Sequence, residues 1–483
     1  MSLLLGIDEG TSAVKAVLYD TDLRPQREAR REKPLHHPKP GWVEQDPDDV
    51  LAAVTEAVAE LLDETPGEIA ACGLDHQGES VLAWDAEDGR TLTPIVTWQD
   101  KRSQEVLDRL EAEGRAGDVR ERSGMPLDPY FSAGKLTWLL EHDDDVARAR
   151  DAGTLRLGTV DSWLCERLGA GFATDSSTAS RTQLGAPEWD DRLLEEFGVP
   201  REALPEIVDT AGDLGSLSHP SWPVELPLRA RCVDQQAALA GAGCVEPGLV
   251  KATYGTGVFV LAHVGAERPT PEGGLLPTVA WRVDGRVEWA LDGGVFTAGA
   301  LLEWLTRDLG LADDPAELAR MVAEVDDAGG VRILPALAGL GAPWWRSGAR
   351  AVIAGLTAGA GPAHVGRAAL ESVTWRVADI VALVAKQVSL EALRVDGGMT
   401  RDPLLLQLQA DTTGVAVQRG AVDATAAGAA ALAAVGAGLW SSTREIGEHV
   451  PLGDRFEPKR DDAWRREEHA IWRSFVERAA ELP

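Results

Sequence analysis

The sequence predicts an α/β protein in which one strand–turn–strand unit is built twice, once in each half of the chain. An apolar strand ends at Asp8, the turn 10–12 (Gly-Thr-Ser) follows, and a second apolar strand continues from it. Residues 249–261 repeat this plan around the turn 255–257 (Gly-Thr-Gly). Glycine lets backbone N–H groups approach an anion, and the hydroxyl adds a donor. The repetition therefore predicts a duplicated nucleotide-binding fold that grips phosphates from both sides.

Length and charge limit the class of protein. A chain of 483 residues is too long for a single hydrophobic core and predicts two domains or more. The formal net charge is −31, whereas binding to nucleic acid needs clustered Lys and Arg, so we expect no nucleic-acid partner. The four cysteines form no C-x-x-C pair, which predicts reduced thiols in a reducing compartment and no zinc site.

Neither a membrane segment nor a targeting segment is predicted. No apolar run reaches about 18 residues without charge or frequent glycine. The start of the chain has no basic region and meets Asp8 at once, unlike a signal peptide. We therefore expect a cytoplasmic protein that does not contact a membrane.

After the first hairpin, which spans residues 1–20, apolar strands alternate with helices. Asp46 is the predicted cap of a helix whose apolar residues recur at helical spacing as far as Leu62. Further strands are predicted at 69–74, 80–84, 94–98 and 228–233, and further helices at 133–142, 191–197 and 235–242. Strands that end in polar turns, with helices between them, describe α/β layers, and α/β proteins usually bind ligands at such strand ends.

The Gly-rich stretch 241–248 is the predicted boundary between a first domain, 1–242, and a second domain, 243–483. The second half begins with the second hairpin and continues with helices at 298–309, 363–387 and 403–414 and a strand at 392–395. Residues 424–437 predict a small-residue helix suited to close packing. The last helix, 461–480, carries an apolar stripe by which we expect it to dock on the second domain, formed by Trp464, Ile471, Trp472 and Phe475.

Polar residues at the first turn indicate phosphate chemistry. Asp8 can hold a magnesium ion through water, because Mg²⁺ is usually bound by one or two carboxylates and by substrate phosphates. Thr11, Ser12 and Lys15 could then contact phosphate. A hairpin with a solvated Asp8 would show the same motif, but the second turn at 255–257 favours the phosphate interpretation.

Three other stretches carry candidate site residues whose chemistry the local pattern leaves open. Asp234 follows a strand and begins a helix, so it is either the base that accepts the proton of an attacking hydroxyl or the cap of that helix. The pair 397–398 (Gly-Gly) is either a ligand-binding turn or an ordinary strand-to-helix turn. Trp98 and Tyr130 either line a sugar pocket or belong to the core.

Several long stretches, taken in chain order, carry a resemblance to a known family. They are residues 6–12, 41–47 (Gly-Trp-Val-Glu-Gln-Asp-Pro), 130–139, 174–182, 234–238 and 397–411. With them the chain resembles the FGGY family of carbohydrate kinases, and within it the glycerol kinases most closely. The resemblance covers residues 1–450, and signatures of this length in family order are highly specific.

The resemblance implies two actin-like, ribonuclease-H-like domains of the sugar kinase and hexokinase superfamily, with a cleft between them. It implies ATP with Mg²⁺ as cofactors, Asp234 as the general base and Asp8 as the magnesium-associated carboxylate. It places the polyol against Glu79, Trp98, Tyr130, Asp234, Gln235 and Phe259. It places the nucleotide against Thr11, Ser12, Lys15, Gly255, Thr256, Gly299, Glu303, Gly398, Met399 and Asp402. It also implies a homodimer or homotetramer.

The chain departs from the glycerol kinases at three positions. Gly78 stands where they carry an arginine, which removes a donor to a substrate hydroxyl worth about 1.5–3 kcal/mol and predicts a larger hole for a longer polyol or a ketose. Glu9 replaces the more usual glutamine and adds negative charge near the phosphates. Asp402 stands where an asparagine is common, which alters the predicted adenine contact.

We therefore predict an ATP-dependent kinase that phosphorylates a hydroxyl of a small polyol or sugar, as glycerol kinases do. A kinase for pentuloses or longer polyols is the alternative within the family, and Gly78 favours it. A non-catalytic, actin-like ATP-binding assembly protein is the alternative from another class. A second pocket built from Glu79, Trp98, Tyr130 and Asp234 argues against that alternative, because an assembly protein needs no acceptor site.

Overall fold

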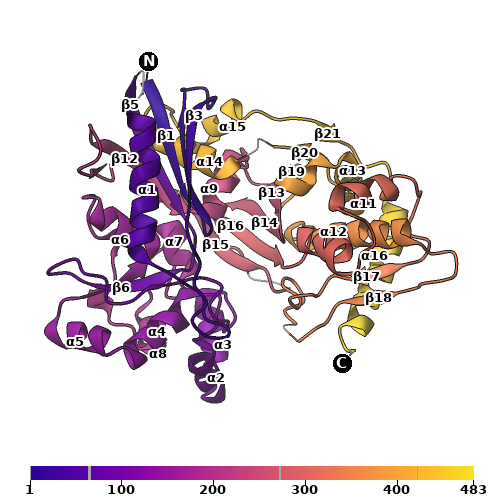
Figure 1. Cartoon of the computed structure of the whole chain (residues 1–483), viewed down its shortest axis with the longest axis horizontal. Coiled ribbons are helices and arrows are strands. Elements are labelled where there is room, and N and C mark those ends of the chain that lie inside the picture. The colour runs from indigo at the N-terminus through magenta and orange to yellow at the C-terminus, as the bar shows by residue number, and fades with distance from the viewer. Residues whose placement is uncertain (1, 64–66, 271–272, 347, 421–422, 483) are drawn as a thin grey trace.

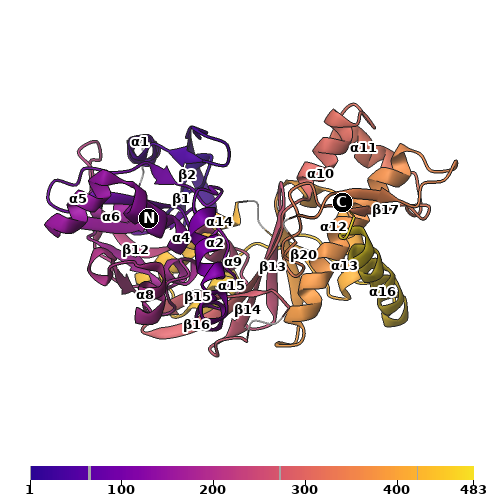
Figure 2. The ribbon, with the colours of Figure 1, turned by 90° about the horizontal axis from the view of Figure 1, so that it is seen from below.

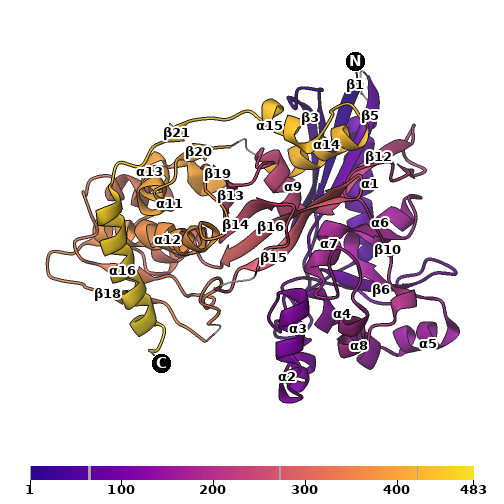
Figure 3. The same cartoon turned by 180° about the vertical axis from the view of Figure 1, so that it is seen from behind.

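The computed structural model forms two lobes, each built on one large β-sheet (Figure 1). It describes residues 2–63, 67–270, 273–346, 348–420 and 423–482. The first half of the chain, indigo to magenta, forms one lobe, and most of the second half forms the other. The same two lobes are seen from below in Figure 2 and from behind in Figure 3.

The sheet of the first lobe has six strands in the order β11-β12-β5-β1-β2-β3. Its strands are β1 (Ser2–Glu9), β2 (Ala13–Tyr19), β3 (Pro25–Glu32), β5 (Glu68–His76), β11 (Ser216–Leu217) and β12 (Leu226–Val233). β1 and β2 form the predicted antiparallel hairpin, whereas β5 runs parallel to β1 and β12 runs parallel to β5. The carboxyl ends of β1, β5 and β12 therefore meet at one edge of the sheet.

The sheet of the second lobe repeats this plan in the order β15-β16-β14-β13-β19-β20-β21. Its strands are β13 (Leu249–Tyr254), β14 (Val258–Gly265), β15 (Leu276–Val283), β16 (Arg286–Val295), β19 (Ala392–Asp396), β20 (Val417–Arg419) and β21 (Arg455–Phe456). β13 and β14 form the second predicted hairpin, and β19 and β20 continue the sheet in parallel. Each lobe thus has a hairpin with an antiparallel strand on one side and two parallel strands on the other, which confirms the predicted duplication.

Helices cover these sheets, and smaller sheets extend the lobes. The helices of the first half are α1 (Pro47–Leu62), α2 (Gln104–Ala112), α3 (Ala116–Ser123), α4 (Ser132–His142), α5 (Asp144–Ala152), α6 (Val160–Arg167), α7 (Ser176–Arg181), α8 (Asp191–Phe197) and α9 (Asp234–Gly241). Those of the second half are α10 (Gly299–Glu303), α11 (Pro315–Val322), α12 (Pro362–Val384), α13 (Pro403–Thr413), α14 (Ala424–Gly436), α15 (Ile446–His449) and α16 (Asp462–Ala479). The smaller sheets contain β4 (Glu44–Gln45), β6 (Val81–Asp85), β7 (Ile95–Val96) and β8 (Leu155–Thr159); β9 (Ala173–Asp175) and β10 (Glu206–Val208); and β17 (Arg332–Leu334) and β18 (Val352–Ala354). In the described part of the chain, none of the helices combines the length and apolar character that crossing a membrane requires.

Local sequence signals set the starts of two helices that matter for the site. Asp46 caps α1 as predicted, because its side chain accepts the N–H of Asp48 at 2.9 Å. α9 begins differently: its N-cap is Val233, which makes no side-chain capping bond, and Asp234 is the first helical residue. Asp234 is therefore not the capping residue of this helix.

The C-terminal helix α16 docks on the second lobe, as predicted. Trp472, Phe475 and Val476 are buried in a cluster that includes Trp375 of α12. Ile471 was wrongly assigned to this apolar stripe, because its side chain is 40% exposed. The buried positions 472, 475, 476 and 479 recur at helical spacing, so the buried face is centred beside position 471 rather than on it.

Helix α14 belongs to the second half of the chain but packs directly on the sheet of the first lobe (Figures 1 and 3). Carbonyl oxygens of α14 lie 2.1 Å and 2.0 Å from where a Cβ would stand at Gly6 in β1 and Gly73 in β5. α14 also crosses α9, where a Cβ at Gly428 would lie 1.8 Å from the carbonyl oxygen of Ala237. Only glycine lets backbones approach so closely, which confirms the predicted close packing and adds its partner.

We expect Gly428→Ala to lower the free energy of unfolding by about 1–3 kcal/mol, because the new methyl group would overlap the Ala237 carbonyl and force α9 and α14 apart. Gly117→Ala in α3 is the matched control. In the described part of the chain, no atom outside the local helix backbone and the two neighbouring residues lies within 4 Å of a Cβ at Gly117, so alanine there should leave stability unchanged or raise it slightly. Denaturant unfolding measures both variants, and equal stability would contradict the tight crossing of α9 and α14.

Candidate active site

Three carboxylates gather at the edge where the parallel strands of the first lobe end. Asp8 lies opposite Asp75 in the register of β1 and β5, and Asp234 follows the last residue of β12. Asp75 is fully buried, whereas Asp8 and Asp234 are partly exposed. The sequence predicted Asp8 and Asp234 for this edge but missed Asp75. The signal that could have found it was its position directly after the predicted strand 69–74.

Crowding of these carboxylates changes their acidity. Burial, followed by the negative charge of Asp234, raises the pKa of Asp8 from 3.8 to about 6. Burial raises the pKa of Asp75 well above its usual value, and the charges of Asp8 and Asp234 add to the rise. Burial also raises the pKa of Asp234, while Lys251 and His76 oppose this rise. The cluster therefore carries an excess of negative charge that a bound cation would relieve.

The residues present fit a magnesium ion. Both carboxylate oxygens of Asp75 are buried and receive no hydrogen bond from a donor in the described part of the chain, and the Asp8 carboxyl lies next to them. Among the described residues, no three or more Asp, Glu, His or Cys side chains are arranged to hold a metal alone. Because Mg²⁺ usually takes one or two carboxylates together with substrate phosphates, Asp8 and Asp75 would hold it and phosphate oxygens would complete its ligands.

We expect Asp75→Asn to raise the free energy of unfolding of the ligand-free protein at pH 7, because it removes a buried charge whose pKa is raised by burial. The same change should raise the Mg²⁺ concentration needed for half-maximal activity about 10–100-fold, by analogy with losses of metal-supporting carboxylates. Thermal unfolding and a Mg²⁺ titration of activity measure the two effects. Lower stability with an unchanged Mg²⁺ requirement would refute the assignment.

A second group of side chains lies beside the carboxylates and consists of Glu79, Trp98, Tyr130 and Arg181. The Trp98 and Tyr130 rings are in edge-to-face contact with centroids 5.8 Å apart. Arg181 Nε donates to Glu79 Oε1 at 2.6 Å, and Arg181 Nη2 donates to the Tyr130 hydroxyl at 3.5 Å. Burial raises the pKa of Glu79 and of Tyr130, and the charge of nearby Asp234 contributes to each rise. The structure thus brings together the polyol residues that the sequence predicted in the first half.

Arg181 is the member of this group that sequence analysis missed as a site residue. Its guanidinium forms ion pairs with Glu79 at 2.6 Å and with Asp292 of β16 at 2.9 Å. All three side chains are nearly buried. Arg181 therefore connects the pocket of the first lobe to the sheet of the second. Glu79 lies 102 positions away in the chain, so no local pattern shows this contact.

The space directly beside Gly78 is occupied, whereas the larger hole expected there stays a prediction. A Cβ at Gly78 would lie 2.8 Å from Cγ1 of Val233, so the Val233 side chain fills the space where a longer residue would begin. The next residue, Glu79, has φ 59°, a left-handed conformation that non-glycine residues keep only where their surroundings hold them. The ion pair with Arg181 and a bond from Ser132 Oγ to the Glu79 carbonyl at 3.2 Å supply that hold.

The first turn connects the carboxylates to the pocket. Trp98 Nε1 donates to Thr11 Oγ1 at 2.9 Å, so a predicted polyol residue touches a predicted phosphate residue. Ser12 is exposed beside Thr11. Lys15 has a different partner, because its ammonium forms an ion pair with Asp423 at 2.6 Å, just before α14. Its assignment to the phosphates stays a prediction.

Glu9 does not add an open negative charge to the phosphate turn, contrary to the expectation. It is fully buried and forms an ion pair with Lys33, whose side chain is also fully buried. Burial lowers the pKa of Lys33 to about 7, while the charge of Asp8 opposes the fall. Sequence analysis missed Lys33 because it follows a highly charged strand, β3, and looks like one more exposed lysine.

The second turn gathers the predicted nucleotide residues of the second lobe. The Gly299 N–H donates to the Gly255 carbonyl at 3.0 Å, and the Ala300 N–H donates to the Thr256 carbonyl at 3.2 Å. A Cβ at Gly299 would lie 3.6 Å from Sδ of Met399, which places the turn that begins at Gly398 beside the same glycines. The structure therefore brings these residues together around the start of α10.

The remaining predicted residues take separate positions. Glu303 is exposed at the end of α10. Asp402 is the N-cap of α13 and accepts the Leu404 N–H at 2.9 Å, so its contact with adenine stays a prediction. Gln235 Oε1 accepts a hydrogen bond from Lys251 Nζ at 2.8 Å. Phe259 is partly buried in β14, and its contact with the polyol stays a prediction.

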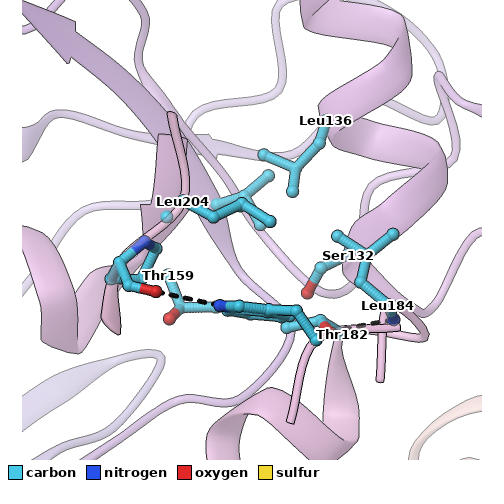
Figure 4. A pocket seen from close by; sticks show the side chains of 10 residues that line it. Ser132, Leu136, Thr159, Thr182, Leu184 and Leu204 are labelled. Atoms are coloured by element: carbon cyan, nitrogen blue, oxygen red, sulfur yellow. Dashed lines mark hydrogen bonds between the residues drawn. The ribbon is translucent and has the colours of Figure 1, made fainter. Parts of the chain in front are cut away.

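Figure 4 shows a pocket of the first lobe that adjoins this site at Ser132. It is lined largely by apolar side chains, among them Leu136, Leu184 and Leu204. The Leu184 N–H at its wall is already bonded to Thr182 Oγ1 at 3.1 Å. None of the predicted site residues lines this pocket, so we assign it to the packing of the first lobe.

Two domain models of one protein family match most of the chain. The N-terminal domain model of the FGGY family of carbohydrate kinases matches residues 3–241, and its C-terminal domain model matches residues 250–437. The chain belongs to the FGGY family of carbohydrate kinases. It is therefore an ATP-dependent kinase with the actin-like two-domain fold, it acts on an alcohol group of a small sugar or polyol, and it uses ATP with Mg²⁺.

Individual relatives match this FGGY kinase along its whole length. It is 43% identical to a glycerol kinase of Citrifermentans bemidjiense over 489 aligned residues, which cover 99% of this chain and 98% of the relative. It is 41% identical to a glycerol kinase of Aromatoleum aromaticum, with 99% of each chain covered. The crystal structure of Plasmodium falciparum glycerol kinase with ADP matches with a TM-score of 0.94 at 29% identity and covers 100% of this chain and 99% of that one.

Proposed function

We propose that this FGGY kinase transfers the γ-phosphoryl group of ATP to a hydroxyl of glycerol. The observation that carries the proposal is that the Val233 side chain occupies the space directly beside Gly78, where room for a longer polyol or a ketose would begin. The 43% identical relative that is named a glycerol kinase supports the same substrate. The same contact argues against the pentulose and longer-polyol alternative, which Gly78 favours in the sequence.

In this proposal the acceptor lies between Glu79 and Asp234. Glu79, held by Arg181, accepts hydrogen bonds from substrate hydroxyls, and Trp98 and Tyr130 enclose the carbon chain. Asp234 orients the reacting hydroxyl and takes its proton while the oxygen bonds to the γ-phosphorus and the bond to ADP breaks. Its raised pKa suits this role, because a carboxylate with a higher pKa is a stronger base.

The phosphates are held from two sides. Backbone N–H groups and hydroxyls of the turns 10–12 and 255–257 donate to phosphate oxygens, and Gly299, Gly398 and Met399 border the nucleotide. Bound Mg²⁺, held by Asp8 and Asp75, supplies charge neutralisation at the transferring group. Positioning and electrostatics then provide most of the rate, since phosphoryl transfer requires little covalent chemistry from the protein.

A coupled measurement of ADP release tests the acceptor. We expect kcat/KM to be highest for glycerol among glycerol, erythritol, ribitol, xylulose, ribulose and gluconate. Val233→Ala should raise the values for the longer acceptors relative to glycerol, because it empties the space beside Gly78; a methylene group in a pocket changes selectivity about 10–200-fold. A higher wild-type kcat/KM for any longer acceptor would overturn the glycerol assignment.

We also propose a cytoplasmic location. Its support is that all four cysteines, Cys72, Cys165, Cys232 and Cys244, are buried free thiols, as is usual in a reducing compartment. The homodimer or homotetramer that the resemblance implies stays a prediction.

A further inference from the structure

A closed ring of hydrogen bonds connects the phosphate turn to the polyol pocket. Its members are Thr11, Gln45, Gln77, Ser80 and Trp98, which we call the polar ring. Gln45 Nε2 donates to the Thr11 carbonyl at 2.8 Å, and Trp98 Nε1 donates to Thr11 Oγ1 at 2.9 Å. Ser80 Oγ accepts the backbone N–H of Trp98 at 3.1 Å and donates to Gln77 Oε1 at 3.2 Å. Gln77 Nε2 closes the ring by donating to Gln45 Oε1 at 2.7 Å.

The polar ring lies between the two substrates of the proposed reaction. Thr11 belongs to the phosphate turn, Trp98 belongs to the polyol pocket, and Gln77 begins the turn that carries Glu79. Gln45, Gln77 and Ser80 are buried, so water does not compete for their hydrogen bonds. A displacement at Trp98 therefore reaches Thr11 through bonds that are strong in these low-dielectric surroundings.

The buried ion pair of Glu9 and Lys33 is attached to this ring at Gln77. Gln77 Nε2 donates to Glu9 Oε1 at 3.1 Å, and the Gln77 N–H donates to the Glu9 carbonyl at 2.9 Å. A carboxylate can only accept, so Gln77 must present its NH₂ group to Glu9 and its oxygen to Ser80. Lys33 supplies the positive charge that stabilises the buried Glu9 carboxylate. The backbone N–H of Lys33 donates to the Ser12 carbonyl at 2.9 Å.

We propose that Glu9 and Lys33 are a positioning pair that couples acceptor binding to nucleotide binding. Neither side chain touches a substrate; Glu9 anchors Gln77, and through Gln77 the polar ring keeps Trp98 and Thr11 in fixed relation. A bound acceptor that fixes the position of Trp98 then also fixes Thr11 for phosphate binding. A bound nucleotide favours acceptor binding in the same way, because the coupling between two binding sites is reciprocal. The inference rests on the proposed function only in that acceptor and ATP bind at these two places.

Three variants test the pair. Lys33→Met leaves Glu9 as a buried charge without its positive counter-ion. Glu9→Gln/Lys33→Met removes both charges but keeps an amide oxygen that can accept from Gln77. Glu9→Met/Lys33→Met removes both the charges and the anchor, and an apolar pair of this kind often leaves stability unchanged or raised. Lys386→Met, at an exposed lysine after α12, is the control for loss of a lysine.

Calorimetry measures the acceptor Kd with and without Mg²⁺ and a non-hydrolysable ATP analogue. In the wild type and in Lys386→Met, we expect the analogue to tighten acceptor binding about 5–150-fold. Lys33→Met and Glu9→Met/Lys33→Met should lose this tightening and about 10²-fold in kcat/KM, as expected of misplaced reacting groups. Glu9→Gln/Lys33→Met should retain most of the tightening of acceptor binding and most of the kcat/KM.

Two outcomes overturn the proposal. One is a wild type in which the ATP analogue does not tighten acceptor binding, or a Glu9→Met/Lys33→Met variant with normal melting in which the analogue still does. The other is an equal loss in both double variants, which would show that the accepting oxygen at position 9 does not matter. The acceptor used is the best one in the ADP-release screen, so a failed glycerol assignment leaves this test intact.

Discussion

Asp234→Asn is expected to lower kcat about 10²–10⁴-fold, the usual contribution of a general base. Asparagine has nearly the same shape but cannot take a proton from the acceptor hydroxyl. Acceptor binding should change much less, because Glu79, Trp98 and Tyr130 remain in place. Steady-state ADP release gives kcat, and calorimetry gives the acceptor Kd.

The control for this prediction is Asp313→Asn, at an exposed aspartate outside the site. Asp234→Asn should not melt earlier than the wild type, because it removes one of three mutually repelling carboxylates. Loss of activity can therefore be separated from loss of folding. Turnover close to that of Asp313→Asn would rule out Asp234 as the base.

Arg181→Met is expected to lower the free energy of unfolding by about 3–5 kcal/mol, the cost of leaving buried charges without their partner. The change leaves two carboxylates, Glu79 and Asp292, without their positive partner. They are 3% and 7% exposed, so water cannot solvate them instead. Activity should also fall, because Glu79 loses the contact that holds it in its left-handed conformation. Thermal and denaturant unfolding measure the stability.

Two further variants make the Arg181 result specific. Arg192→Met removes an exposed arginine with three acidic neighbours and should melt close to the wild type, since surface ion pairs contribute little. Arg181→Met/Glu79→Gln should recover part of the lost stability without recovering activity. Equal melting temperatures for Arg181→Met and Arg192→Met would show that the buried ion pairs of Arg181 with Glu79 and Asp292 do not stabilise the fold.

Sequence reasoning located the parts of the site that depend on local pattern. The two hairpins, Asp8 and Asp234 follow from strands that end in polar residues, because strand ends in an α/β sheet converge by geometry. Asp46 as the cap of α1 was equally local. The family resemblance then named the pocket residues, and the structure brings Glu79, Trp98 and Tyr130 together.

What the sequence could not show depends on contacts between distant segments. Arg181 and Lys33 look like two of many charged residues, and only the fold reveals that each is buried against a particular glutamate. The surroundings of Gly78 could not be seen for the same reason, because the space beside it is occupied by Val233 on another strand. The small residues of α14 indicated close packing but could not indicate that the partner was the sheet of the first lobe.

The position of α14 has a consequence for how the chain reaches its folded state. A ribosome releases the whole first sheet long before it makes residues 424–436, so β1 and β5 wait with their glycine face uncovered until the second half is nearly complete. The two halves share one strand plan, yet a face of the first sheet is covered by a helix of the second half. A nascent or truncated chain that ends near residue 242 would present this face to chaperones or to other nascent chains.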